Sequence, residues 1–197
     1  MTLHLLEASP RDVRDALDVA AARGRRVALA SGARMYGYGV LTVGGLATPF
    51  HNLISTYGDR YYTEQAIAGV QPANASAPTR VTGMKLGTGT TAVAKSGAGA
   101  ACVTYITGSN AAFDATFPTA TAVTGTDAGW QVTYQTTWAA GTATNSAIAE
   151  AVIVDDSATD ATSTAAHTIA RALISPAADK TAGLPATALW HHVLLGA

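Results

Sequence analysis

One glycine-rich stretch has the spacing of a phosphate-binding loop. Residues 87–92 read Gly-Thr-Gly-Thr-Thr-Ala and follow a predicted strand, which fits the loose dinucleotide fingerprint G-x-G-x-x-[GA]. The same stretch nearly spells a P-loop that ends at Lys95, with Ala94 in place of the second glycine. Such loops bind phosphate where a helix begins directly after them, but Gly97 and Gly99 fall in the interior of that helix, at a cost of about 1 kcal/mol each. A loop between two strands explains these residues without a ligand, so we expect no nucleotide site.

Two other groups of side chains could bind a metal ion. His191 and His192 are adjacent, and neighbouring residues of a strand point to opposite faces, so the two imidazoles cannot easily chelate one ion. We expect one of them to be buried and the other exposed. Asp155, Asp156 and Asp160 lie in a predicted hairpin loop, but they lack the D-x-[DN]-x-[DN]-G spacing of a calcium loop. We expect a solvated acidic loop there.

The remaining chemically active residues favour structural roles. Glu150 and Arg171 lie in neighbouring predicted strands and could pair across the sheet. The single cysteine, Cys102, excludes an intramolecular disulfide and is expected to be a small buried apolar residue. The sequence contains no Ser-His-Asp spacing and no H-E-x-x-H motif. We therefore predict no catalytic, cofactor-binding or metal-binding residues, no cofactor and no enzymatic activity.

The clearest strand in the sequence covers residues 130–138. Aromatic and apolar side chains recur there at every second position, which is the period of a β-strand, so they should share one buried face. Further strands are predicted at 81–86, 101–107, 148–154, 168–174 and 187–195. The side chains expected on the buried face of the first strand are Trp130, Val132, Tyr134 and Trp138.

Residues 80–197 are therefore expected to form an antiparallel β-sandwich, jelly-roll or Ig-like, because strands of this spacing must cover their apolar faces. The fold class is mainly β, with one or two N-terminal helices and an extended N-terminal arm.

The N-terminal part of the sequence has a different character. Ser9 and Pro10 indicate a helix start, and Val13, Ala16, Leu17 and Ala20 follow at helical spacing. Gly24 should end this helix. A short strand is predicted at 25–30, followed by irregular chain to residue 50. Six of the chain's 12 basic residues lie before residue 40. We interpret residues 1–50 as a docking arm that orders on a neighbouring subunit, although a solvated helix face is an equal alternative.

The segment 51–79 connects this arm to the strands. A second helix is predicted at 55–68, and the composition of 71–79 is that of a linker.

The overall composition limits the function. Of the 197 residues, 48% are hydrophobic and only 13% are charged, with a net charge of −1. Nucleic-acid binding needs clustered Lys and Arg, so we expect no nucleic acid as a partner. A surface with so little charge favours a homo-oligomer. No run of about 18 apolar residues indicates a membrane span, and the N-terminal residues do not have the pattern of a secretory signal.

Several strand and turn segments resemble a group of tailed-phage virion proteins labelled tail-fibre or minor tail proteins. The resemblance covers residues 50–197 and rests on an M-x-L-G-T-G run at 84–89, an I-x-E-x-x-I strand at 148–153, an I-A-R strand at 169–171 and a closing strand around Trp190. In those phage proteins the closing strand often reads T-W-x-H. This chain has Ala188-Leu-Trp-His191 there, with Pro185 just before it.

The resemblance implies a non-enzymatic structural component of a phage particle, associated with the tail, baseplate or fibre and assembled in the host cytoplasm. Its partners would be other virion proteins, in the tail, baseplate or capsid. A capsid decoration or head-fibre protein is one alternative, and a receptor-binding module that contacts a host surface glycan is another. A small enzyme is the alternative from a different class of function.

Overall fold

The structure is a computed structural model that describes residues 10–31, 35–64, 80–124 and 129–195. The helices are α1 (Pro10–Ser31) and α2 (Thr56–Tyr62), with a short 3-10 helix η2 (Gly97–Ala100). The strands are β1 (Met35–Val43), β2 (Leu46–Ile54), β3 (Gly83–Gly87), β4 (Ala111–Ala112), β5 (Thr119–Val123), β6 (Gly129–Trp138), β7 (Asn145–Val154), β8 (Thr168–Lys180) and β9 (Ala186–Leu195).

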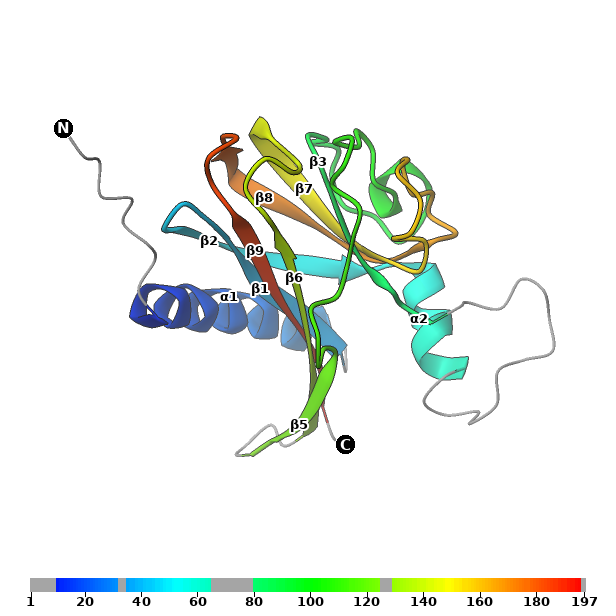
Figure 1. Cartoon of the computed structure of the whole chain (residues 1–197). Helices are drawn as coiled ribbons and strands as arrows, with labels where there is room; N and C mark the ends of the chain where they lie inside the picture. The colour runs from blue at the N-terminus through cyan, green and yellow to red at the C-terminus, as the bar shows by residue number, and fades with distance from the viewer. Residues whose placement is uncertain (1–9, 32–34, 65–79, 125–128, 196–197) are drawn as a thin grey trace.

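The nine strands form one continuous sheet in the order β4-β3-β7-β8-β2-β1-β9-β6-β5. All the pairings are antiparallel, and the sheet curls into a half-barrel (Figure 1). The mainly β, antiparallel and sandwich-like fold predicted from the sequence is therefore confirmed. The predicted strands at 130–138, 148–154, 168–174 and 187–195 correspond to β6, β7, β8 and β9.

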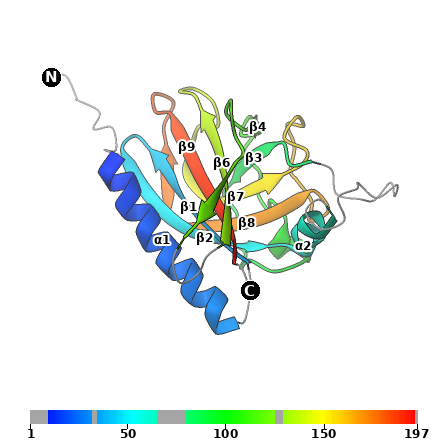
Figure 2. The ribbon, with the colours of Figure 1, turned by 90° about the horizontal axis from the view of Figure 1, so that it is seen from below.

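The concave inner face of the sheet holds the main core, where Leu41, Met84, Trp138, Ile153 and Trp190 are buried. The outer face is covered in two parts. Helix α1 packs along β1 and β2 (Figure 2), and the loops at 88–110 and 155–167 cover β3 and β7 through a smaller apolar cluster. The outer face is thus covered by two different means, a helix over β1 and β2 and loops over β3 and β7.

Strands β1 and β2 correct the expected division of the chain. They lie in the middle of the sheet, where β2 pairs with β8 and β1 pairs with β9. Residues 35–50 are therefore not part of an irregular docking arm, and residues 80–197 are not a self-contained sandwich. The two strands are joined through Gly44 and Gly45, which both have positive φ. A two-residue loop of that kind is the favoured hairpin turn, so the Gly-Gly pair was the signal for this hairpin.

Helix α1 is longer than the sequence predicts. It continues through Gly24 to Ser31, so the predicted strand at 25–30 is wrong. A glycine costs only about 1 kcal/mol inside a helix, and the residues on both sides of Gly24 are good helix formers such as Ala, Arg and Leu. The expected apolar stripe is confirmed, because Val13, Ala16 and Leu17 are half-buried and Ala20 is buried.

One other predicted element differs from the structure, and a second is confirmed at its start. Residues 101–107 are not a strand, because their backbone hydrogen bonds go to separate partners: the Cys102 N–H donates to Ser163 and the Ile106 N–H to Leu86. Helix α2 begins where predicted, capped by the Ser55 side chain, which accepts from the Gly58 N–H. The rest of the predicted helix, from residue 65, and the linker at 71–79 lie outside the described residues.

The alternating face of β6 is only partly buried. Tyr134 and Trp138 lie in the core, and Val132 packs against it, as expected. Trp130, however, is 59% exposed. It lies on the same face at the far end of the strand, beyond the reach of the core that covers Tyr134, so its assignment to the core is wrong.

The two tryptophans of β6 should therefore differ sharply in their contribution to stability. Trp138→Ala should lower the free energy of unfolding by about 3–5 kcal/mol, because it leaves a cavity in the core. Trp130→Ala should change it by less than about 1 kcal/mol. Urea denaturation of the two variants at one low protein concentration measures both values, and equal losses would contradict the assignment of these faces.

Candidate functional site

The glycine-rich loop after β3 wraps around a carboxylate of the protein itself. Oε1 of Glu150, on β7, accepts hydrogen bonds from the backbone N–H groups of Gly89 (3.2 Å) and Thr104 (2.8 Å). A Cβ at residue 89 would lie 2.6 Å from the same oxygen, so glycine is needed for this close approach. The loop leads to η2 and not to an α-helix. This stretch therefore lacks the helix N-terminus on which phosphate binding by the fingerprint depends.

Glu150 also forms the cross-strand pair with Arg171 that the sequence predicts. Oε2 of Glu150 accepts from Nε of Arg171 at 2.8 Å, and Nη2 lies 2.8 Å from the same oxygen. Both side chains are fully buried. Nη1 of Arg171 donates to the Thr91 carbonyl at 2.7 Å. The pair therefore ties the glycine-rich loop to β7 and β8, which is a structural role.

Cys102 lies against this pair, and its thiol is unreactive. Its thiol is buried, and burial together with the negative charge of Glu150 raises its pKa to about 12. The thiol therefore stays protonated at neutral pH, where a reactive cysteine would need to be a thiolate. The expectation of a small buried side chain is confirmed, although the strand predicted around it is not.

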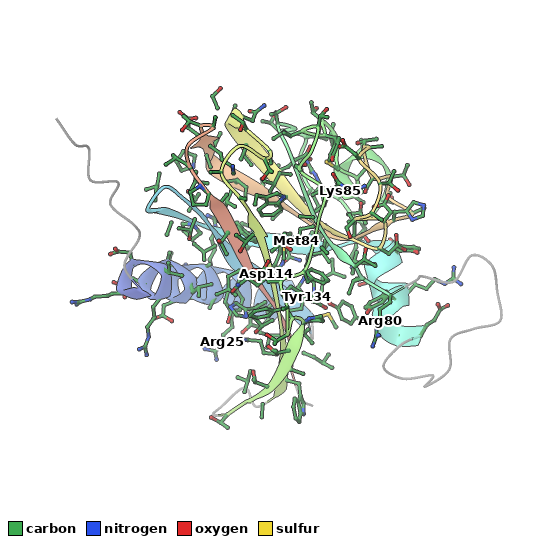
Figure 3. The ribbon with its side chains drawn as sticks, in the orientation of Figure 1. Arg25, Arg80, Met84, Lys85, Asp114 and Tyr134 are labelled. Carbon is green, nitrogen blue, oxygen red and sulfur yellow. The ribbon has the colours of Figure 1, made fainter. Side chains whose placement is uncertain are left out.

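A second buried charge, Lys85 on β3, was not singled out from the sequence. Its Nζ lies 3.1 Å from Oδ1 of Asp156 and donates to the Ala161 carbonyl at 2.9 Å. Its neighbour Met84 points into the main core, so the two side chains lie on opposite faces of β3 (Figure 3). In the sequence, the alternation Met84-Lys85-Leu86 is that of a strand with one solvated face, so no signal distinguished Lys85 from an exposed lysine.

The three aspartates of the predicted acidic loop are engaged by the protein. The Asp155 carboxylate accepts from the Tyr57 hydroxyl at 2.7 Å and lies 2.8 Å from Nδ1 of His167. The Asp160 carboxylate accepts from the Tyr105 hydroxyl at 2.6 Å. The side chain of Asp155 is only 1% exposed, so the expectation of a solvated acidic loop is wrong for this residue, whereas Asp160 is exposed as expected. These acids fasten the loop at 155–167 to the body of the protein.

The histidine pair lies on opposite faces of β9, as expected, but both rings are buried. His191 is 8% exposed and His192 is 2% exposed, which corrects the expectation of one exposed imidazole. On the outer face, His191 contacts the ring of Tyr38, and its Nδ1 lies 2.9 Å from the hydroxyl of Thr133. Within the described ranges, no group of three or more His, Cys, Asp or Glu side chains could hold a metal ion.

His192 belongs to a buried chain of hydrogen bonds that we call the inner relay: Trp190, Asn52, His192, Tyr62 and Tyr134. The Trp190 indole N–H donates to Oδ1 of Asn52 at 2.9 Å, and Nδ2 of Asn52 lies 3.2 Å from Nε2 of His192. Nδ1 of His192 contacts the Tyr62 hydroxyl, which lies 2.9 Å from the hydroxyl of Tyr134. The relay thus joins β2, β9, α2 and β6.

The donors of the relay determine its direction. An indole nitrogen can only donate, so Asn52 accepts with Oδ1 and donates with Nδ2 to His192. Nε2 of His192 is therefore unprotonated, and its Nδ1 proton is donated to Tyr62. Burial, aided by the neighbouring His191, lowers the pKa of His192 to about 3. The ring is thus neutral at pH 7 and holds α2 against the sheet.

A glycine makes this geometry possible. Gly37 lies opposite both Asn52 and His192 in the sheet. A Cβ at residue 37 would lie 2.6 Å from Cδ2 of His192, too close for any real contact, so only glycine leaves room for the relay at this position.

The relay supports an open groove of about 540 Å³ beside the end of α2. We call it the aromatic groove; its main lining residues are Tyr61, Arg80, Val81, Phe113, Phe117 and Pro118. The ring of Tyr61 meets Tyr62 edge to face at 5.3 Å, and the ring of Phe113 packs on Tyr134 at 5.2 Å. Two walls of the groove are therefore each held by a tyrosine of the relay.

The groove could not be found from the sequence. Its residues come from the end of α2, from the start of β3 and from the chain between β4 and β5. Figure 3 places Arg80 near α2 and Tyr134 in the middle of the molecule. No spacing pattern links these segments. The antiparallel pairing of β3 with β4 joins two of them, and the inner relay holds α2 beside them.

No family model, no curated protein and no solved structure matches this chain. Neither helix in the described part of the chain combines the length and the apolar character that crossing a membrane requires.

The buried Glu150–Arg171 pair should contribute much more to stability than an exposed pair. Glu150→Gln leaves Arg171 without its counter-charge and should cost about 3–5 kcal/mol of unfolding free energy. Adding Arg171→Gln should cost less than the sum of the single changes, by about 1–3 kcal/mol. The matched control is Lys95→Gln at the exposed Lys95–Asp59 pair (2.6 Å), where the loss should stay below about 1 kcal/mol. Chemical denaturation of the four variants gives these values, and simple additivity at the buried pair would contradict the coupling.

The buried histidines should make stability depend on pH. Burial lowers the pKa of His191 to about 4 and that of His192 to about 3, from an ordinary value of 6.5. Between pH 6.5 and pH 4 the unfolded chain therefore binds more protons than the folded protein, so the free energy of unfolding falls as the pH falls. At pH 5 the loss should be roughly 2 kcal/mol for each histidine.

Denaturation at pH 7 and pH 5 measures this loss. His191→Asn keeps a polar atom in the place of Nδ1 and should remove about half of the pH effect. A stability that is equal at the two pH values would show that these rings are charged or exposed in the folded protein.

Proposed function

We propose that this chain is a non-enzymatic structural component of a tailed-phage particle, associated with the tail, baseplate or fibre, and that it acts through contacts between subunits. Two lines of argument support the proposal. One is the resemblance of its strand and turn segments to phage virion proteins. The other is a feature of the described residues, namely an open sheet edge with no charge.

That edge is β5, the last strand of the sheet, which among the described residues pairs only with β6. Its sequence is Thr-Ala-Thr-Ala-Val, and the residues from Thr119 to Ala122 are exposed. In Figure 1, β5 lies at the lower end of the molecule, away from α1 and from the covering loops. Soluble proteins usually protect such an edge with Lys, Pro or a bulge, because its free N–H and C=O groups can pair with another chain. An unprotected edge is suited to pairing with a neighbouring subunit.

An exposed apolar row lies beside this edge. Trp130 is opposite Leu194 in the pairing of β6 with β9, and opposite Ala122 in the pairing with β5. Trp130 and Leu194 are 59% and 47% exposed. A subunit that extended the sheet at β5 would lie next to this row and could cover it. The hydrogen-bonding edge and the apolar row thus form one surface.

Two alternatives have their own supporting features. A capsid decoration or head-fibre protein is favoured by α1, whose exposed side carries five arginines that could lie on a shell; they are Arg11, Arg14, Arg23, Arg25 and Arg26. A receptor-binding module is favoured by the aromatic groove.

Labelling of whole particles tests the proposal. An antibody against the purified chain should mark the tail of phage particles released from the bacterium that encodes it, as seen by electron microscopy. Label on the head would support the decoration alternative instead. Particles without any label would overturn the structural proposal.

A charge placed on the open edge should weaken self-association. Thr121→Lys puts a cation on β5, and like charges that meet at an interface should weaken it about tenfold or more. Thr159→Lys, in the exposed loop after β7, is the matched control and should leave association unchanged. Sedimentation over a range of concentrations measures both. A monomeric parent chain, or equal association of both variants, would contradict a role for β5.

A further inference from the structure

We propose that the aromatic groove binds a small ligand in which a six-membered ring carries a carboxylate. The size of the groove, its charge and its rigidity all favour such a ligand. It does not depend on how the chain assembles.

The size of the groove suits one ring with its substituents. Its volume of about 540 Å³ lies within the range of roughly 300–1,000 Å³ that is usual for small-molecule sites. The rings of Tyr61, Phe113 and Phe117, together with Pro118, line the groove as flat surfaces beside the polar side chains of Arg80 and Thr82. Flat walls of this kind pack against the face of a ring, whether it is aromatic or a sugar.

The charge of the groove favours an anion. Arg80 is exposed and lines the groove, and none of the ion pairs among the described residues involves it. Glu64, one turn beyond Tyr61, is paired with Arg60 at 2.6 Å and so does not neutralise Arg80. A guanidinium group matches a carboxylate through two parallel hydrogen bonds. The groove therefore offers one cation beside its aromatic rings.

The groove is also held in shape before any ligand arrives. Tyr61 and Phe113 pack on Tyr62 and Tyr134 of the inner relay, and the Tyr61 hydroxyl bonds to the backbone at Val81. Side chains that are already ordered lose little entropy on binding, which favours affinity. The buried relay thus positions a surface site.

Two sources could supply this chemistry: an acidic sugar unit of a glycan, or an aromatic carboxylate. Four probes separate them, namely glucuronate, glucose, benzoate and benzyl alcohol. Each charged probe is paired with a neutral one that has a ring of the same kind. Amide chemical shifts of the isotope-labelled full chain, followed during titration, report both affinity and location. The titration extends to about 10 mM because a weak single site with a free energy of binding of about −4 kcal/mol has a dissociation constant in the millimolar range.

We expect at least one carboxylate probe to bind about tenfold more tightly than its neutral partner. Its binding should shift the amide signals of Val81, Thr82 and Phe113. Glucuronate alone would identify the acidic sugar, and benzoate alone the aromatic acid. Arg80→Gln should reduce the preference for the charged probe to near onefold. Phe117→Leu should weaken both members of a pair, while Arg11→Gln on α1 should change nothing. If no probe shifts the groove residues, or if charged and neutral probes bind equally, the proposal is wrong.

Discussion

The pairing of β1 with β9 is the constraint on which the rest of the structure depends. Nine consecutive residue pairs, from Met35 with Leu194 to Val43 with Ala186, join the strands in the middle of the sheet. On one side lie β2, β8, β7, β3 and β4, and on the other lie β6 and β5. Without this pairing the sheet would be two separate pieces, each with an open edge and an uncovered apolar face. The same register places His192 beside Gly37 and Asn52, and so sets up the inner relay.

Several of the few charged residues of this chain lie in the interior of the protein. Glu150, Arg171, Lys85 and Lys180 are all buried, although charged residues make up only 13% of the sequence. Each of them binds backbone groups of a loop; Lys180, for example, donates to the carbonyls of Ala139 and Thr142. A charged side chain that is buried against a loop adds no charge to the surface of the protein. Because these charges are buried, the surface keeps few of them, and it includes the uncharged edge at β5 and the exposed Trp130.

The sequence allowed strands β6 to β9 to be predicted, and the reason is local. Strands such as β6 alternate apolar and polar residues, and the Glu150–Arg171 pair follows once two neighbouring strands are placed. Strands β1 and β2 were missed because the five glycines between residues 32 and 45 suggested irregular chain. Gly37, however, is required by side chains from distant strands. The burial of both histidines depends in the same way on Tyr62 and Tyr38, which lie far away in the sequence. The groove has no sequence signal at all, because it exists only where three separate segments meet.

The position of β1 also has a consequence for the order of folding. Asn52 and Trp190, which meet beside β1, are 138 residues apart in the chain. During synthesis β1 and β2 can form their hairpin early, but the other edge of β1 has no partner until β9 leaves the ribosome. Contacts of such long range are slow to form, and an unpaired strand invites wrong pairing while it waits. The free edge of the nascent β1–β2 hairpin is therefore open to wrong pairing until β9 is made.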